Sequence, residues 1–371
     1  MNTAASFAGK LQVRPGRPWP HNLRSSRRDW AFLVTRGMHA AQLPATLASL
    51  YSLCGRAHRL CGQMALDAAH GHEIVRREPI PAGLRDETLR EHLHRICLDW
   101  PVQLGAEEGG LRTDVLGRAL RCCPLFGGDD PSDLPRWLEQ HLLGMPAADW
   151  LACWQRSPAR WLAAWSSHSH SAAAMLLDGL QPFADWPLAG ALPLRVQAGD
   201  ADLLELAAPL LGAADYSRAP LWHGRPAETG PWARLATPSA ERCETPWLRL
   251  GARLAELVSL ALGYAPLMRG CLPIGPGAGL AWVETARGLL VHAVQLEGHG
   301  ADARIAACRV LAPTEWNFHP QGAVARALAT LPARPGPAES RRIRVLMAAY
   351  DPCVPFEIEA AADAPLEVHD A

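Results

Sequence analysis

The chain contains 371 residues, of which 49% are apolar, and its formal net charge is -1. Such a composition can bury a large core, and it lacks the basic field that would attract nucleic acid or an anionic membrane. We therefore expect no nucleic-acid partner, and no membrane insertion, since no apolar run reaches the length of a membrane span. The ten cysteines are spread over a long chain, which is typical of reduced thiols in a cytoplasmic protein.

Residues 1–28 are rich in Arg, Pro and Ser without periodicity, which predicts a loosely ordered N-terminal arm. Residues 29–371 contain no internal repeat and no clear linker, so we expect a single domain there. Apolar residues recur at helical spacing over 44–54, 57–68, 87–100, 111–121, 134–142, 147–165, 203–211, 247–262 and 322–331. Strand patterns occupy 30–34, 280–283, 289–296, 304–311 and 343–349. The predicted fold is α+β, mostly α, with a helical bundle and small β-sheet elements.

One thiol near the C-terminus stands between two prolines. Pro352 keeps Asp351 out of the helical region and Pro355 does the same for Val354, so we expect Cys353 to be presented on a turn, outside any helix or strand. A presented cysteine is suited to bind a metal. The structural alternative is a strand that ends in a proline turn with a buried cysteine.

A second candidate site lies at a predicted helix break. Cys54 precedes Gly55, and a thiol near a helix N-terminus is biased toward the thiolate that binds soft metals. His58 and Cys61 would share its face if the helix were continuous, which makes both possible additional ligands. The alternative is a helix face of small residues packed in the core.

Three further stretches carry polar groups next to apolar segments. Arg287 precedes an apolar strand, where it could meet an anionic ligand or pair with a carboxylate. Pro313 and Thr314 follow the next strand and offer a hydroxyl and backbone amides at a turn. Glu228 lies between two arginines in a loop rich in Gly and Pro, and we expect ion pairs that fix this loop.

Taken in this order, these stretches resemble the large subunit of nickel-iron hydrogenases. The resemblance spans most of the chain. Five motifs of that family correspond to stretches of this sequence. They are Cys-Gly-x-Cys (residues 54–57), Glu-x-Gly-Pro-x-Ala-Arg (228–234), Glu-x-x-Arg-Gly-x-x-x-His (284–292), Pro-Thr-x-Trp-Asn (313–317) and Asp-Pro-Cys-x-x-Cys (351–356). Five motifs in the same order imply a large-subunit-like fold.

Departures from the motifs change the implied function. In the enzymes four cysteines bind nickel, and two of these also bridge to an iron that carries cyanide and carbon monoxide. The bridging positions here hold Ala57 and Phe356, whose side chains cannot coordinate a metal. In addition, Glu359 stands where the enzymes have the histidine after which a precursor tail is removed, so we do not expect that cleavage.

The remaining pattern resembles the HupK/HoxV-type hydrogenase maturation proteins. That resemblance implies a non-catalytic scaffold for the Fe(CN)2CO fragment, without nickel. It places iron on Cys54 and Cys353, and it places Arg287, Pro313 and Thr314 around the cyanides. The implied partners are HypC/HypD-type cofactor-assembly chaperones and the hydrogenase large-subunit precursor. Two alternatives remain: a structural homologue without metal, and a hydrogenase with unusual ligation.

Overall fold

The computed structural model describes residues 9–359 except for 73–74, 105–113, 128–129, 190–191, 196–199, 214, 236–243 and 265. Its helices are α2 (Trp30–Thr35), α3 (Leu43–Leu50), α4 (Gly55–Ala69), α5 (Ala82–His94), α6 (Trp100–Leu104), α7 (Asp114–Arg121), α8 (Pro124–Gly127), α9 (Leu134–Leu138), α10 (Ala147–Arg156), α11 (Pro158–His168), α12 (Ala172–Ala184), α13 (Asp200–Gly212), α14 (Pro231–Leu235), α15 (Pro246–Ala261), α16 (Pro313–Asn317), α17 (Ala323–Ala329) and α18 (Pro337–Tyr350). Its strands are β1 (Leu11–Val13), β2 (Leu23–Ser25), β3 (Glu78–Pro79), β4 (Leu192–Pro193), β5 (Ala227–Glu228), β6 (Met268–Gly275), β7 (Ala278–Thr285), β8 (Gly288–Glu297), β9 (Arg304–Leu311) and β10 (Phe356–Ile358).

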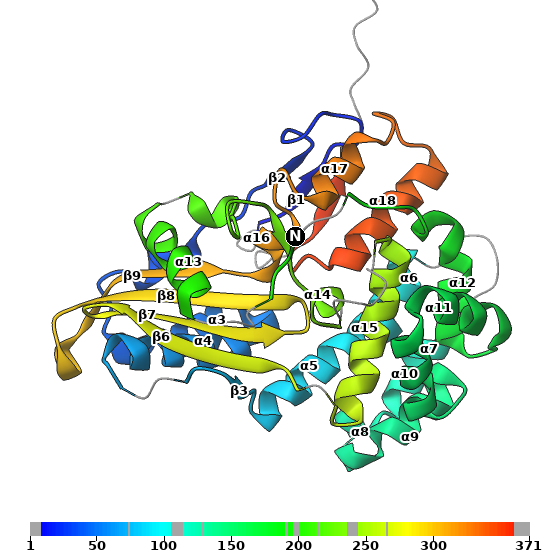
Figure 1. Cartoon of the computed structure of the whole chain (residues 1–371), viewed down its shortest axis with the longest axis horizontal. Coiled ribbons are helices and arrows are strands. Elements are labelled where there is room, and N and C mark those ends of the chain that lie inside the picture. The colour runs from blue at the N-terminus through cyan, green and yellow to red at the C-terminus, as the bar shows by residue number, and fades with distance from the viewer. Residues whose placement is uncertain are drawn as a thin grey trace, which may run out of the picture.

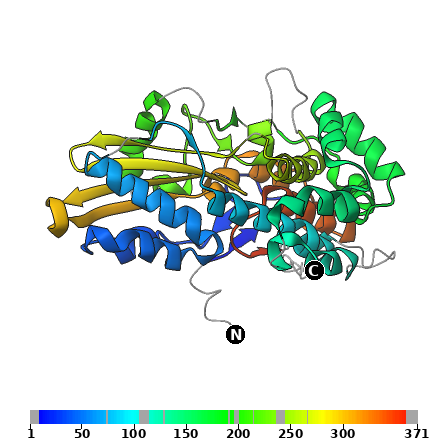
Figure 2. The ribbon, with the colours of Figure 1, turned by 90° about the horizontal axis from the view of Figure 1, so that it is seen from below.

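An antiparallel sheet of order β3-β6-β7-β8-β9 forms one half of the molecule (Figure 1). Side chains alternate across β7: Ala281 and Val283 join the core that contains α4, whereas Leu280 and Trp282 join the one that contains α13. Figure 2 shows the sheet between α3 and α4 on one side and α13 on the other. Both faces are therefore covered, which explains why β7 is buried along nearly its whole length.

Helices form the other half, around α15. Every residue from Pro246 to Leu260 is buried, and the helix packs against α5, α10, α11, α12 and α18. Thr245 caps its first turn by accepting a hydrogen bond from the Leu248 N–H, and Pro246 occupies the first helical position. The predicted α+β architecture with a helical bundle is confirmed.

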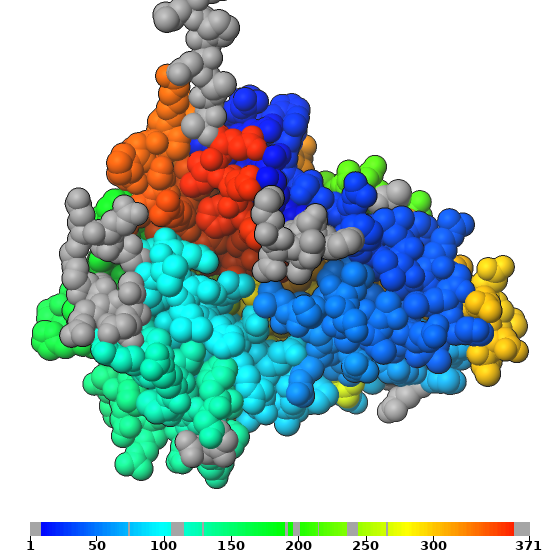
Figure 3. Space-filling view, turned by 180° about the vertical axis from the view of Figure 1, so that it is seen from behind, coloured from blue at the N-terminus to red at the C-terminus, as the bar shows by residue number. Residues whose placement is uncertain are grey.

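The N-terminal segment is structured where it is described, contrary to the loosely ordered arm that its composition predicts. Strand β1 pairs with β2 and, in parallel, with β10, so that Leu11 lies opposite Phe356. In Figure 3 the C-terminal residues (red) accordingly lie against the N-terminal residues (blue). The pairing strand is more than 300 positions away along the chain, and a local pattern cannot reveal such a partner.

Two predicted strands are helices instead. Residues Trp30–Thr35 form α2, because the Asp29 side chain accepts a hydrogen bond from the Phe32 N–H and caps the first turn. The apolar run 343–349 belongs to α18, which starts with Pro337 and packs against α12 and α15. In both segments the short apolar run was compatible with a helix or a strand, and packing against neighbouring elements determined that each forms a helix.

Candidate functional site

A cavity of about 340 Å³ lies where the start of α4, the β7–β8 turn, α16 and the turn after α18 come together. Most of the predicted site residues line it: Cys54, His58, Arg287, Pro313, Thr314 and Cys353. The structure thus brings together side chains that are separated by up to 299 positions in the sequence. Apolar side chains, including Leu290 and Val354, complete the walls.

Cys61 is not among the residues that line this cavity. Its side chain is fully buried against the sheet, and its thiol donates a hydrogen bond to the Ala281 carbonyl at 3.3 Å. The expected ligand stripe fails because Cys54 lies in a short 3-10 turn (Ser52–Cys54) before α4 begins. Cys54 and Cys61 therefore do not share one continuous helix, on which their spacing would put them on the same face.

Burial raises the pKa of the Cys54 thiol to about 12, although the nearby Arg287 acts in the opposite direction. The sequence suggested a thiolate favoured by the helix N-terminus. Burial acts in the opposite direction and favours the protonated thiol. Binding of a metal by Cys54 would therefore require loss of the thiol proton.

Cys353 lies on the turn that follows α18, as its flanking prolines predict. The Thr314 hydroxyl donates a hydrogen bond to its sulfur at 3.1 Å and accepts one from its backbone N–H at 3.2 Å. The Arg27 guanidinium also donates to this sulfur. Two donors from distant segments therefore hold the half-buried thiol at the cavity.

Asp351 fixes the start of the same turn. Its backbone has a φ of 49°, in the left-handed region, and its buried carboxylate pairs with three arginines. The Oδ1 atom lies 2.9 Å from Arg95 Nε, and Oδ2 lies 3.0 Å from Arg253 Nη2 and 3.3 Å from Arg287 Nε. Burial acts to raise the pKa of Asp351, but the arginines more than offset it and hold this pKa below its usual value.

Arg287 has one of the two roles that the sequence left open, because it pairs with carboxylates. Its guanidinium is 5% exposed and pairs with Glu91, with Nη2 and Oε2 2.7 Å apart, as well as with Asp351. It also lines the cavity. Burial acts to lower the pKa of Arg287, but the adjacent carboxylates raise it overall, so the side chain is a permanent cation.

Arg27 is a site residue that the sequence does not reveal. It projects from the N-terminal segment, lines the cavity, and pairs with Glu315, with Nε and Oε1 3.0 Å apart. Burial acts to lower its pKa, but Cys353 and Glu315 raise it overall. No local motif surrounds Arg27, and its contact with Cys353 spans 326 positions of the sequence.

Comparisons with known proteins identify the family. The chain is 38% identical to hydrogenase expression/formation protein HoxV of Cupriavidus necator, over 100% of both chains. It is 33% identical to hydrogenase expression/formation protein HupK of Rhizobium leguminosarum bv. viciae, over 88% of this chain and 90% of that one. The chain belongs to the HoxV/HupK family of hydrogenase expression/formation proteins. No protein-family model matches it.

Solved structures show the fold of this HoxV/HupK-type chain. The nickel-iron-selenium hydrogenase of D. vulgaris Hildenborough aligns with a TM-score of 0.52 at 14% identity, over 89% of this chain and 92% of that one. An NAD+-reducing nickel-iron hydrogenase aligns with a TM-score of 0.51 at 16% identity, over 89% and 91%. The predicted nickel-iron large-subunit-like fold is confirmed.

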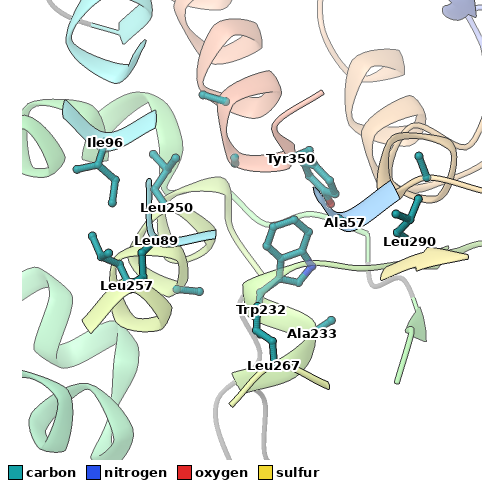
Figure 4. Close-up of a cluster of buried hydrophobic side chains, with 14 of the residues drawn as sticks. Ala57, Leu89, Ile96, Trp232, Ala233, Leu250, Leu257, Leu267, Leu290 and Tyr350 are labelled. Carbon is teal, nitrogen blue, oxygen red and sulfur yellow. The ribbon is translucent and has the colours of Figure 1, made fainter. Parts of the chain in front are cut away.

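The HoxV/HupK-type chain lacks side chains that could bind metal at the two bridging positions. Ala57 is fully buried, and Figure 4 shows it among apolar side chains that include Leu290 and Tyr350. Phe356 belongs to β10, where it is paired with Leu11 of β1. Within the described ranges, no cluster of three or more His, Cys, Asp and Glu side chains is placed to hold a metal ion. The cavity wall offers the thiols of Cys54 and Cys353 and several hydrogen-bond donors.

Glu228 makes different ion pairs from those that the sequence suggested. Its carboxylate pairs with Arg249 of α15 at 2.9 Å and accepts a hydrogen bond from the Tyr350 hydroxyl at 2.7 Å. The nearby Arg234 pairs with Glu256 instead, at 2.6 Å. The loop is therefore fixed to α15 and to the end of α18, close to the turn that carries Cys353.

The helices that the structure describes include none with both the length and the apolar character needed to cross a membrane.

Proposed function

We propose that the chain binds the Fe(CN)2CO fragment as a cargo, through the sulfurs of Cys54 and Cys353, and delivers it to the hydrogenase large subunit without binding nickel. One observation carries this proposal. The two retained cysteines line a single cavity, whereas the positions that would complete a four-thiolate site hold Ala57 and Phe356. Two thiolates suffice to hold an iron that already carries two cyanides and one carbon monoxide.

The groups around the cavity suit the other ligands of such an iron. Cyanide nitrogens are anionic acceptors, and a site that excludes water must provide donors for them. Arg27 and Arg287 supply such donors at the cavity wall. Thr314 also lines the wall, but its hydroxyl proton is donated to the sulfur of Cys353. The Leu290 and Val354 side chains offer an apolar surface for the carbonyl ligand, which is a poor hydrogen-bond acceptor.

The proposed partners follow from the cargo. HypC/HypD-type chaperones would supply the assembled iron fragment, and the large-subunit precursor would receive it. The HoxV and HupK relatives are named as hydrogenase expression/formation proteins, which supports an accessory, non-catalytic role. A large-subunit-like fold would present the fragment in surroundings similar to those of its destination.

Metal content tests the proposal directly. Chain purified without oxygen from cells that make the iron fragment is expected to contain close to one iron per chain and no nickel, as measured by elemental mass spectrometry. Absence of iron would support the alternative of a metal-free structural homologue. Nickel in equal amount, together with hydrogen uptake by the isolated chain, would support a hydrogenase with unusual ligation.

Arg27 should strengthen cargo binding. Substituting Arg27→Met removes a charged donor at Cys353, and hydrogen bonds to charged groups contribute about 1.5–3 kcal/mol. The expected result is a loss of about tenfold or more in iron affinity. Arg28→Met is the matched control, because Arg28 lines the same cavity but its guanidinium lies 5.9 Å from the centre of the Trp30 ring. Equal affinities for both variants would contradict the role given to Arg27.

A further inference from the structure

Two histidines form a buried pair at the wall of the cavity. His58 on α4 and His292 on β8 are 2% and 0% exposed, and His58 Nδ1 lies 3.0 Å from His292 Nε2. The His58 ring stacks on Tyr51, with ring centres 4.1 Å apart and an angle of 17° between the planes. His58 lines the cavity, and because Nδ1 faces His292, the other ring nitrogen, Nε2, is the one available to a cargo.

Both rings are neutral, which means that each carries one N–H. Burial lowers the pKa of His292 to about 3, and burial together with His292 lowers the pKa of His58 well below its usual value. The short contact between the rings therefore contains a single proton. Either His58 donates through Nδ1, or His292 donates through Nε2.

The surroundings of His292 decide between these arrangements. Its Nδ1 is buried and has no hydrogen-bond partner among the described residues. A Cβ added to Gly62 would lie 3.7 Å from this nitrogen, so Nδ1 is next to the Gly62 backbone. The Cα hydrogens of glycine are weak donors, which suits a bare nitrogen lone pair, whereas a buried N–H without an acceptor costs about 1–3 kcal/mol. His292 therefore carries its proton on Nε2 and donates it to His58.

The geometry points to His58 as a neutral hydrogen-bond donor to the cargo through Nε2–H, not as an iron ligand. Because Nδ1 of His58 accepts from His292, the single proton of the His58 ring must be on Nε2. A protonated ring nitrogen has no lone pair for iron. This inference rests on the proposed function and adds a specific element to it: His292 fixes the tautomer, and the resulting donor recognises a cyanide nitrogen.

Such a donor would make the cavity selective for the cargo. A bare ferrous ion with water ligands presents O–H donors to the wall, and these cannot pair with another donor. A cyanide presents an acceptor. The Nε2–H of His58 thus favours an iron that already carries cyanide.

Infrared spectra of the loaded chain test this inference with two variants. The donor is absent in His58→Phe, whereas the amide of His58→Gln keeps one. The wild type should show two cyanide bands and one carbonyl band. Loss of the hydrogen bond should move one cyanide band of His58→Phe to lower wavenumber, because the bond withdraws electron density from the cyanide nitrogen. The bands of His58→Gln should lie closer to those of the wild type, and both variants should keep their iron.

Several outcomes would overturn the inference without touching the proposed function. An unchanged spectrum of His58→Phe would show that His58 does not contact the cargo, and loss of iron from both folded variants would show that it is a ligand. Nitrogen NMR of the cargo-free chain labelled with ¹⁵N-histidine adds a measurement that does not depend on loading. It should find the proton of His58 on Nε2, and a proton on Nδ1 would refute the tautomer. If the wild-type chain accepted iron without cyanide or carbonyl bands, the proposed function itself would fail.

Discussion

Replacing Cys353 by alanine is expected to remove iron from the chain. This sulfur is one of two proposed anchors, and no other cysteine lies on its turn (residues 351–355). Altering even a residue that only supports a metal ligand commonly costs 10-fold to about 100-fold in metal affinity, and loss of the ligand itself should exceed this range. Iron content and the infrared bands of anaerobically purified protein provide the measurement.

Cys122→Ala is the matched control for this substitution. Cys122 is exposed and does not line the cavity, so the same change in chemistry should leave iron binding intact. A Cys353→Ala chain that retained iron and both kinds of band at the wild-type level would refute the proposed anchoring. A loss of iron from Cys122→Ala would point instead to a general sensitivity of the fold.

Neutralising Asp351 is expected to destabilise the whole chain. Asp351→Asn leaves Arg95, Arg253 and Arg287 around a group without charge, and removing one partner from a buried ion pair typically costs about 3–5 kcal/mol. The free energy of unfolding, measured by denaturant titration, should fall by about 3–5 kcal/mol. The Cys353 turn should also lose its fixed position, so that the folded fraction binds iron more weakly.

Asp99→Asn serves as the comparison. Asp99 pairs with the same Arg95, but its side chain is 35% exposed, and surface pairs of this kind contribute about 0–1 kcal/mol. Equal stability losses in the two variants would mean that the three-arginine cluster contributes no more than an exposed pair. That result would remove the physical basis for a fixed Cys353 turn.

Local patterns predicted the elements that build the core. The apolar run 280–283 in β7 and the apolar spacing of 247–262 in α15 are properties of single segments, and these segments fold as expected. The order of the strands, and the pairing of β1 with β10, depend on contacts between distant parts of the chain. Such contacts have no local signal, which is why the described part of the N-terminal segment was wrongly predicted as loosely ordered.

The candidate site was likewise predictable from local motifs only in part. The motifs that contain Cys54, Arg287, Thr314 and Cys353 predicted residues that the structure places around one cavity. Arg27 has no motif, and only tertiary structure brings it to the sulfur of Cys353.

The sequence also did not reveal the ionisation state of Cys54 or the hydrogen-bond partner of His58. The first depends on burial, and the second depends on the packing of α4 against β8. Sequence motifs indicated which residues meet, whereas burial determines their protonation.

Infrared spectroscopy of the wild-type chain, purified without oxygen from cells that make the iron fragment, tests the central claim most directly. The account predicts two cyanide bands and one carbonyl band, in proportion to one iron per chain. Protein that contained iron but showed none of these bands would contradict it.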